Sequence, residues 1–210
     1  MNKGTSTTLS RRELLRGGSL YAGGLALAIT APRPMAAAMA QQNSAAVSLN
    51  ATQWAEAEAI TARIIPTDDE PGAVEANCVN FIDKALANED AAAKPDFLLG
   101  LEALDGLCQK KFKHGFAALD ASKQDALLKS MELDEAQPWS SQQISAASFF
   151  EMVRAMTIMG FLADPKYGGN QNFSGWRVTH YPGPRHHLGG YTPAQMVGEE
   201  EIITIWGDKQ

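Results

Sequence analysis

The stretch SQQISAASFFEMVRAMTIMGFLA, residues 141–163, predicts a long helix. Its apolar side chains Phe149, Val153, Met156 and Met159 recur at steps of three and four residues, which places them on one helical face. Methionines at this spacing are typical of core or interface packing rather than of a cofactor site. The helix is expected to end before Pro165, where the composition changes.

Four further helices are expected upstream of this one. The apolar periodicity predicts them over residues 50–65, 73–87 and 95–116, and a capping box at 122–125 predicts the start of the fourth. No alternating pattern of useful length, as a half-buried strand would need, occurs before Trp176. The sequence therefore predicts an all-α fold, with a single domain of about five helices over residues 41–210.

The C-terminal residues, from about 165 to 210, are predicted to be a long irregular segment rich in glycine and aromatic residues. A segment this long without a pattern is expected to be functional or held against another surface. Tyr167, Trp176 and Tyr181 are of the types favoured at interfaces, which indicates a docking segment. The alternative is a loop whose aromatic side chains fold back onto their own helices.

The N-terminal residues 1–40 have the order of a twin-arginine export signal. Arg11 and Arg12 precede a weakly apolar run at 17–31, and Ala38-Met39-Ala40 forms a small-residue cleavage site. An uncleaved, anchored N-terminus is the alternative. The twin-arginine route exports proteins that are already folded, so this chain is expected to reach the periplasm as a folded domain.

Charge and cysteine content limit the classes of function. The net charge is −6, and loss of the arginine-containing leader makes the remaining chain more acidic, so nucleic acid is not expected as a partner. The two cysteines, Cys78 and Cys108, lie on apolar faces of neighbouring predicted helices. In an oxidising compartment they can form an intrachain disulfide, bridge to another subunit or stay buried as thiols.

The sequence carries no motif for an active site of its own. It lacks the glycine-rich dinucleotide and phosphate loops and the G-x-S-x-G elbow of serine hydrolases. The carboxylates 68–70 are interpreted as favouring the N-terminus of the next helix, and His180, His186 and His187 do not match zinc-ligand spacing. Catalytic, cofactor-binding and metal-binding residues are therefore not expected, and catalysis by Asp68 or His180 is the least favoured hypothesis.

Several separated motifs resemble one known family. They are IIPTDDEPGA at 64–73, Phe81-Ile82-Asp83, GFLADPKYGGN at 160–170, Gly175-Trp176 and Tyr181-Pro182-Gly183. With the twin-arginine leader, this set is similar to the gluconate 2-dehydrogenase subunit 3 family, the small subunits of flavin-dependent sugar and sugar-acid dehydrogenases. The D-P-x-Y-G-G-N segment is its most specific part.

The resemblance implies a helical accessory subunit without a redox centre. Its implied partners are a large FAD-containing subunit of the glucose–methanol–choline oxidoreductase family, a membrane cytochrome c subunit that holds haem c, and the Tat translocon. The complex would lie in the periplasm, peripheral to the inner membrane, and this chain would stabilise the flavoprotein and supply its export signal. The residues expected at the partner interface are Tyr167, Gly168, Gly169, Asn170, Trp176 and Tyr181. A stand-alone periplasmic binding or chaperone protein is the alternative.

Overall fold

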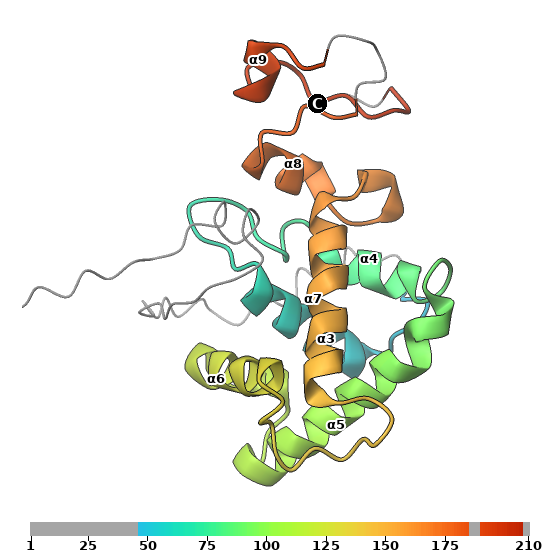
Figure 1. Ribbon diagram of the computed structural model, residues 1–210, viewed down its shortest axis with the longest axis vertical. Coiled ribbons are helices and arrows are strands. Elements are labelled where there is room, and N and C mark those ends of the chain that lie inside the picture. Colours follow the sequence, from blue (N-terminus) through green and yellow to red (C-terminus); the bar gives the residue numbers. More distant parts are fainter. Residues whose placement is uncertain (1–45, 185–189, 208–210) are drawn as a thin grey trace, which may run out of the picture. The chain divides into compact units, whose positions relative to one another are not determined.

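The structure is a computed structural model that describes residues 46–184 and 190–207 (Figure 1). The predicted leader, with Arg11, Arg12, Ala38 and Ala40, lies outside the described residues, as do His186 and His187. The described α-helices are α3 (Ala51–Ile64), α4 (Cys78–Ala85), α5 (Lys94–Phe112), α6 (Ala121–Glu132), α7 (Ala146–Leu162), α8 (Ser174–Val178) and α9 (Pro193–Met196). Short 3-10 turns are η2 (Ala91–Ala93), η3 (Phe116–Ala118), η4 (Pro165–Tyr167) and η5 (Gln171–Phe173). The all-α prediction is confirmed, and its five helices correspond to α3–α7.

Helix α7 is the centre of the packing. It contacts α3, α4, α5, α6 and the short α8 (Figure 1). Phe149 on its first half and Phe161 at its end are both fully buried. Burial of side chains this large contributes about 2 kcal/mol each. The prediction of a long apolar helix at 141–163 therefore identified the element around which the others pack.

Two glycines let neighbouring helices approach aromatic rings closely. Gly100 on α5 lies against the ring of Phe149, and Gly160 on α7 lies against Phe81 on α4, so that a Cβ at Gly160 would stand 3.1 Å from the Cβ of Phe81. Tight packing of this kind allows little change in side-chain volume. The two contacts therefore fix α5 near the start of α7 and α4 near its end.

A small second apolar cluster joins the end of α7 to segments that precede and follow this helix in the sequence. Its members are Ile65, Ala73, Ala76, Cys78, Phe161 and Val178. The main cluster is built from α3–α7 and contains the other cysteine, Cys108. The second cluster holds α8 against the helical body, and it therefore positions the C-terminal segment.

Two helix starts differ from their predictions because of local backbone conformation. Helix α4 begins at Cys78 rather than at 73, since Asn77 has a left-handed backbone with φ of 54° and ends a separate turn. Helix α7 begins after Ser145, whose hydroxyl accepts from the backbone N–H of Ser148 at 3.1 Å. Ser145 pairs a free N–H group of the first helical turn, whereas the left-handed Asn77 interrupts the helical backbone. Hydrophobic periodicity reports neither effect.

The capping box predicted at 122–125 is wrong. Helix α6 is capped two residues earlier by Asp120, whose carboxylate accepts from the backbone N–H of Lys123 at 3.0 Å. Gln124, which was read as part of the box, is buried and donates to the carbonyl of Phe116. Helix α5 likewise ends at Phe112, short of the predicted 116, because Lys113 adopts φ of 62°.

Asp83 anchors the first described residues to α4. This carboxylate is 1 % exposed and accepts from the backbone N–H groups of Val47, Ser48 and Leu49 at 2.7–2.8 Å. Charge-assisted bonds from three backbone donors compensate the cost of burying a carboxylate. Asp83 of the motif Phe81-Ile82-Asp83 therefore has a structural role in this chain, since it holds residues 47–49 against α4.

In the part of the chain that the structure describes, no helix combines the length and the apolar character needed to cross a bilayer.

Candidate partner interface at the C-terminal segment

The D-P-x-Y-G-G-N motif forms a tight turn after α7. Asp164 caps η4 by accepting from the backbone N–H of Lys166 at 3.1 Å. Gly168 then has φ of +97°, a region that glycine enters without a steric penalty. Asn80 on α4 donates from Nδ2 to the Gly168 carbonyl at 2.7 Å, which ties the turn to the helical body.

Asn170 bridges the end of α7 and the start of α8. Its side chain is fully buried, donates from Nδ2 to the Ala163 carbonyl at 2.9 Å and accepts at Oδ1 from the Gly175 N–H at 2.8 Å. Its own backbone N–H donates to the Gly160 carbonyl at 2.7 Å. Asn170 therefore satisfies backbone groups that the two helix ends leave unpaired.

Gly169 is required by a close approach of two backbones. A Cβ at this position would collide with the carbonyl oxygen of Gly160 on α7. The next residue, Gln171, donates its backbone N–H to the Ala76 carbonyl at 3.0 Å. We call residues 164–171 the clasp, because they fasten the C-terminal segment to α4, to the 73–77 turn and to α7.

Trp176 anchors the segment that follows the clasp. It is 4 % exposed, and its Nε1 donates to the Leu162 carbonyl at 2.6 Å. Its ring lies 5.6 Å from that of Phe173 and 5.1 Å, edge to face, from that of Tyr181. Tyr181 in turn contacts Tyr191, and burial together with this neighbour raises the pKa of Tyr181 to about 12. An aromatic row therefore links α8 to the last part of the chain.

The structure divides the predicted interface residues into two groups. Gly169, Asn170 and Trp176 are buried within the chain, where they hold the clasp and α8 in place. Tyr167 is 45 % exposed, and Gly168 and Tyr181 are partly exposed. The fold-back alternative thus describes Phe173 and Trp176, whereas Tyr167 is available to a partner. That these residues form an interface stays a prediction.

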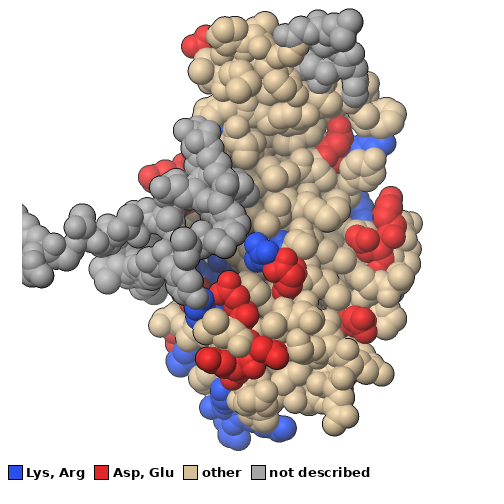
Figure 2. Space-filling view, viewed as in Figure 1, with Lys and Arg blue, Asp and Glu red and all other residues tan. Residues whose placement is uncertain are grey.

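Exposed apolar side chains gather toward the C-terminal end of the sequence. Of the nine large exposed apolar residues among the described positions, all but Val47 and Leu133 lie between residues 159 and 206. We define the C-terminal surface by six of them, namely Tyr167, Tyr191, Met196, Val197, Ile205 and Trp206. In Figure 2 the charged side chains gather over the lower part of the face, whereas the end that carries α8 and α9 in Figure 1 is mostly uncharged.

Sequence reasoning did not single out the last four of these residues. Met196, Val197, Ile205 and Trp206 follow the segment on which the resemblance rests, and they show no helical or strand periodicity. Their exposed fractions are 58, 57, 48 and 56 %, respectively. The available signal was the number of large apolar residues between Met196 and Trp206, which include Ile202 and Ile203 as well.

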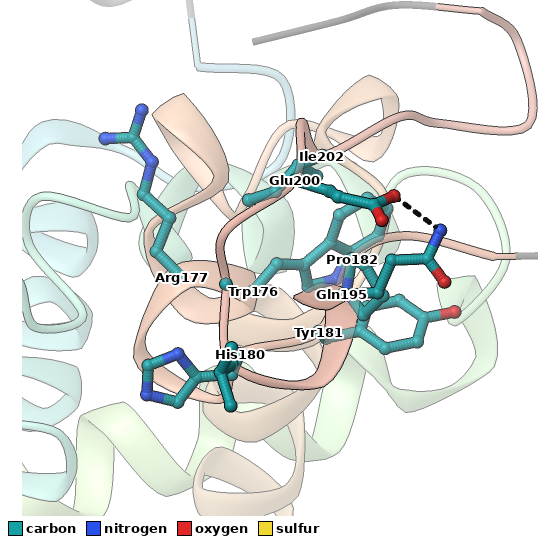
Figure 3. Close-up of a pocket in the computed structure, with 10 residues that line it drawn as sticks. Trp176, Arg177, His180, Tyr181, Pro182, Gln195, Glu200 and Ile202 are labelled. Carbon is teal, nitrogen blue, oxygen red and sulfur yellow. Dashed lines mark hydrogen bonds between the residues drawn. The ribbon is translucent and has the colours of Figure 1, made fainter. Parts of the chain in front are cut away.

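A cavity of about 220 Å³ opens beside the aromatic row (Figure 3). Trp176, Tyr181 and Val197 contribute its apolar lining. Arg177 and His180 lie on one side of it, and Gln195 and Glu200 lie on the other, where Gln195 Nε2 donates to Glu200 Oε2 at 2.9 Å. The cavity thus combines an apolar lining with a cationic side chain at its rim, which suits a protein side chain or a small ligand.

Lys166 of the clasp lies between two exposed rings. Its Nζ stands 3.4 Å from the ring centroid of Trp206 and 4.9 Å from that of Tyr167. Such cation–π contacts hold the end of the tail against the clasp. Within residues 46–184 and 190–207, neither Lys166 nor Arg177 forms an ion pair with a carboxylate.

The two cysteines are free buried thiols in this structure, and no disulfide joins them. Cys108 packs in the main cluster and Cys78 in the second one. Burial raises the pKa of both thiols, to about 12 for Cys108, where Glu56 and Asp105 add to the effect. Within this chain the structure has buried thiols rather than an intrachain disulfide, and the bridge to another subunit stays a prediction.

The carboxylates at 68–70 do not serve the next helix, contrary to the prediction. They lie in a turn in which Asp68 accepts from the Glu70 N–H at 2.9 Å, well before α4 begins at Cys78, whose first turn contains no acidic residue. The described residues contain no group of three or more His, Cys, Asp and Glu side chains placed to hold a metal ion. His180 is exposed at the rim of the cavity.

A second hollow, of about 310 Å³, lies between α3 and α5 and is acidic. Glu56, Glu102 and Asp105 line it. Glu56 is only 5 % exposed, and burial, with a smaller effect of the Asp105 charge, raises its pKa to about 7. A hydrogen bond from the backbone of Phe116 acts in the opposite direction. This carboxyl group therefore changes charge near neutral pH.

Comparison with known proteins places the clasp within a family signature. Residues 51–183 match the family described as gluconate 2-dehydrogenase subunit 3. This range spans α3–α8 and ends before residues 184–210. Neither a curated protein nor a solved structure gives a significant match. The match covers more than half of the chain and includes every motif from α4 to Tyr181-Pro182-Gly183. The chain therefore belongs to the gluconate 2-dehydrogenase subunit 3 family.

Proposed function

We propose that this chain is the non-catalytic small subunit of a periplasmic, membrane-associated, flavin-dependent dehydrogenase that oxidises gluconate or a related sugar. The family match over residues 51–183 is the observation that carries this proposal, since it makes the chain a subunit of a gluconate 2-dehydrogenase complex. In this complex, FAD belongs to the large subunit and haem c to a cytochrome c subunit in the inner membrane. The small subunit stabilises the flavoprotein and supplies its export signal.

The sequence supports the export role through its leader. Arg11 and Arg12 mark the route that carries folded proteins, and this chain has no recognisable cofactor motif that would by itself call for such a route. A flavoprotein must fold around FAD before export. Transport of a folded pair through one leader therefore accounts for the presence of the signal on the small subunit.

The structure supports the stabilising role through its C-terminal segment. The clasp and Trp176 tie this segment to the helical body, while the apolar side chains of the C-terminal surface keep 39–58 % of their surface exposed. Apolar surface of this kind is typical of protein–protein interfaces.

Co-expression tests the proposal directly. The flavoprotein subunit from the same organism is produced with the wild-type chain, without it, and with an Arg11→Lys/Arg12→Lys variant. We expect periplasmic flavoprotein only with the wild-type chain, because the paired arginines direct export of the complex. An Arg16→Lys variant is the matched control, since it alters a leader arginine outside the pair and should preserve export.

Equal amounts of periplasmic flavoprotein with and without this chain would refute the proposal. Purification of this chain from the periplasm alone, without flavin absorbance, would instead favour a stand-alone binding or chaperone protein.

A further inference from the structure

We infer that the C-terminal surface and the 220 Å³ cavity beside it form the docking site for the flavoprotein subunit, which inserts an apolar side chain into the cavity and places a carboxylate beside Arg177 or Lys166. This inference rests on the proposed function, because it takes its partner from there. It adds the location of the interface and the chemistry of the partner segment.

The distribution of exposed apolar residues locates the interface. The helical body exposes Val47, Leu133 and Met159 as single large apolar residues, whereas Met196 with Val197 and Ile205 with Trp206 are adjacent pairs, each residue about half exposed. Such residues remove much apolar surface from water when a partner covers them. Among the described residues, the C-terminal surface is therefore the region best suited to association.

The cavity supplies the point of insertion. Its apolar lining comes from side chains that are already fixed, since Trp176 is bonded to the end of α7 and packs against Tyr181. A preformed cavity of this size accepts one aliphatic or aromatic side chain without reordering of the chain. Val197 lies at its wall and is 57 % exposed, so it contacts both the inserted side chain and the surrounding partner surface.

Charge complementarity specifies the partner. Arg177 at the rim of the cavity and Lys166 in the clasp are cations without a carboxylate partner in the described part of the chain. A partner carboxylate placed beside either cation would form a charge-assisted bond that is partly shielded from water. The partner segment is therefore an apolar residue flanked by Asp or Glu.

The exposed carboxylates of this segment disfavour one other occupant. An anionic lipid surface would be repelled by the exposed Glu199 and Glu200 in the same segment. A partner protein whose carboxylate faces Arg177 or Lys166, away from Glu199 and Glu200, avoids this conflict.

The experiment measures binding of the purified wild-type chain, residues 41–210, to the flavoprotein subunit by titration calorimetry or surface immobilisation. Val197→Glu places a charge in the cavity wall, and Arg177→Glu reverses the charge at its rim. We expect each to weaken binding by about tenfold or more. Leu133→Glu and Lys110→Glu, which make the same chemical changes on the helical body, should bind as the wild-type chain does.

The outcomes separate the inference from the function on which it rests. No binding of the wild-type chain to the flavoprotein would refute the proposed function. Wild-type binding that Val197→Glu and Arg177→Glu leave unchanged, with all variants folded by circular dichroism, would overturn the docking site alone. If the wild-type chain alone forms a dimer in light scattering and the same two variants do not, the surface belongs to a second copy of the chain. If the wild-type chain binds anionic vesicles and the two variants do not, the surface belongs to a membrane. Either result would overturn the docking site.

Discussion

Replacement of Glu56 by glutamine should remove a pH-dependent loss of stability from this protein. Glu56 lies on α3 with only 5 % of its surface exposed, and its pKa in the folded protein is raised from 4.5 to about 7, mainly by burial. Glutamine keeps the shape of the side chain and the acceptor for the Phe116 backbone but does not ionise. The variant therefore isolates the cost of a buried negative charge.

The sign follows from the direction of the shift. Below pH 4.5 the group is protonated in both the folded and the unfolded chain, so it costs nothing. As the pH rises from 4.5 through 7, the unfolded chain ionises readily while the folded chain resists, and the folded state loses stability. Above this window the loss is complete and remains constant.

The magnitude follows from the same shift. One pKa unit corresponds to about 1.4 kcal/mol, so the rise from 4.5 to about 7 sets an upper bound of about 3 kcal/mol. The carboxyl group borders an open hollow of about 310 Å³, from which water screens part of the charge. We therefore expect a loss of about 2 kcal/mol in the wild-type chain.

Urea unfolding of residues 41–210, followed by circular dichroism at pH 4 and pH 8, measures the effect. The Glu56→Gln variant should match the wild-type chain at pH 4 and exceed its free energy of unfolding by about 2 kcal/mol at pH 8. Glu102→Gln is the control, because it removes an exposed carboxylate from the same hollow. Parallel pH profiles for the wild-type chain and Glu56→Gln would refute the reasoning.

Three further predictions concern two buried hydrogen-bonding side chains and the two buried thiols. Asn170→Ala leaves a buried carbonyl and N–H unpaired and should cost about 2–4 kcal/mol of unfolding free energy, with proteolysis focused after the clasp; an unchanged urea midpoint would contradict the bridge. Asp83→Asn, which loses a carboxylate bonded to three backbone N–H groups, should cost about 2 kcal/mol and speed hydrogen exchange at residues 47–49. Cys78 and Cys108, both fully buried thiols, should react with alkylating reagents only after unfolding, and a mass that shows a disulfide in the non-reduced protein would contradict this.

The sequence by itself determined the fold class and the family. Apolar residues at three- and four-residue steps identified α3–α7, and the motifs from 64 to 183 identified the subunit 3 family. Helix boundaries were less well determined. Asn77, Asp120 and Ser145 set three helix starts through backbone conformation and side-chain hydrogen bonds, to which hydrophobic periodicity does not respond.

Only the tertiary structure decided what the residues of the family motifs do in this chain. Asn170 and Trp176 are predicted to lie at the partner interface. Both are buried instead, because their side chains donate to the carbonyl groups of Ala163 and Leu162, which have no helical partner at the end of α7. Glu56 carried no sequence signal at all, since its raised pKa depends on burial and on Asp105, 49 positions away in the numbering of the chain. Periodicity reports which face of a helix is apolar, whereas hydrogen-bond partners and desolvation depend on which segments meet in space, and the fold alone fixes that.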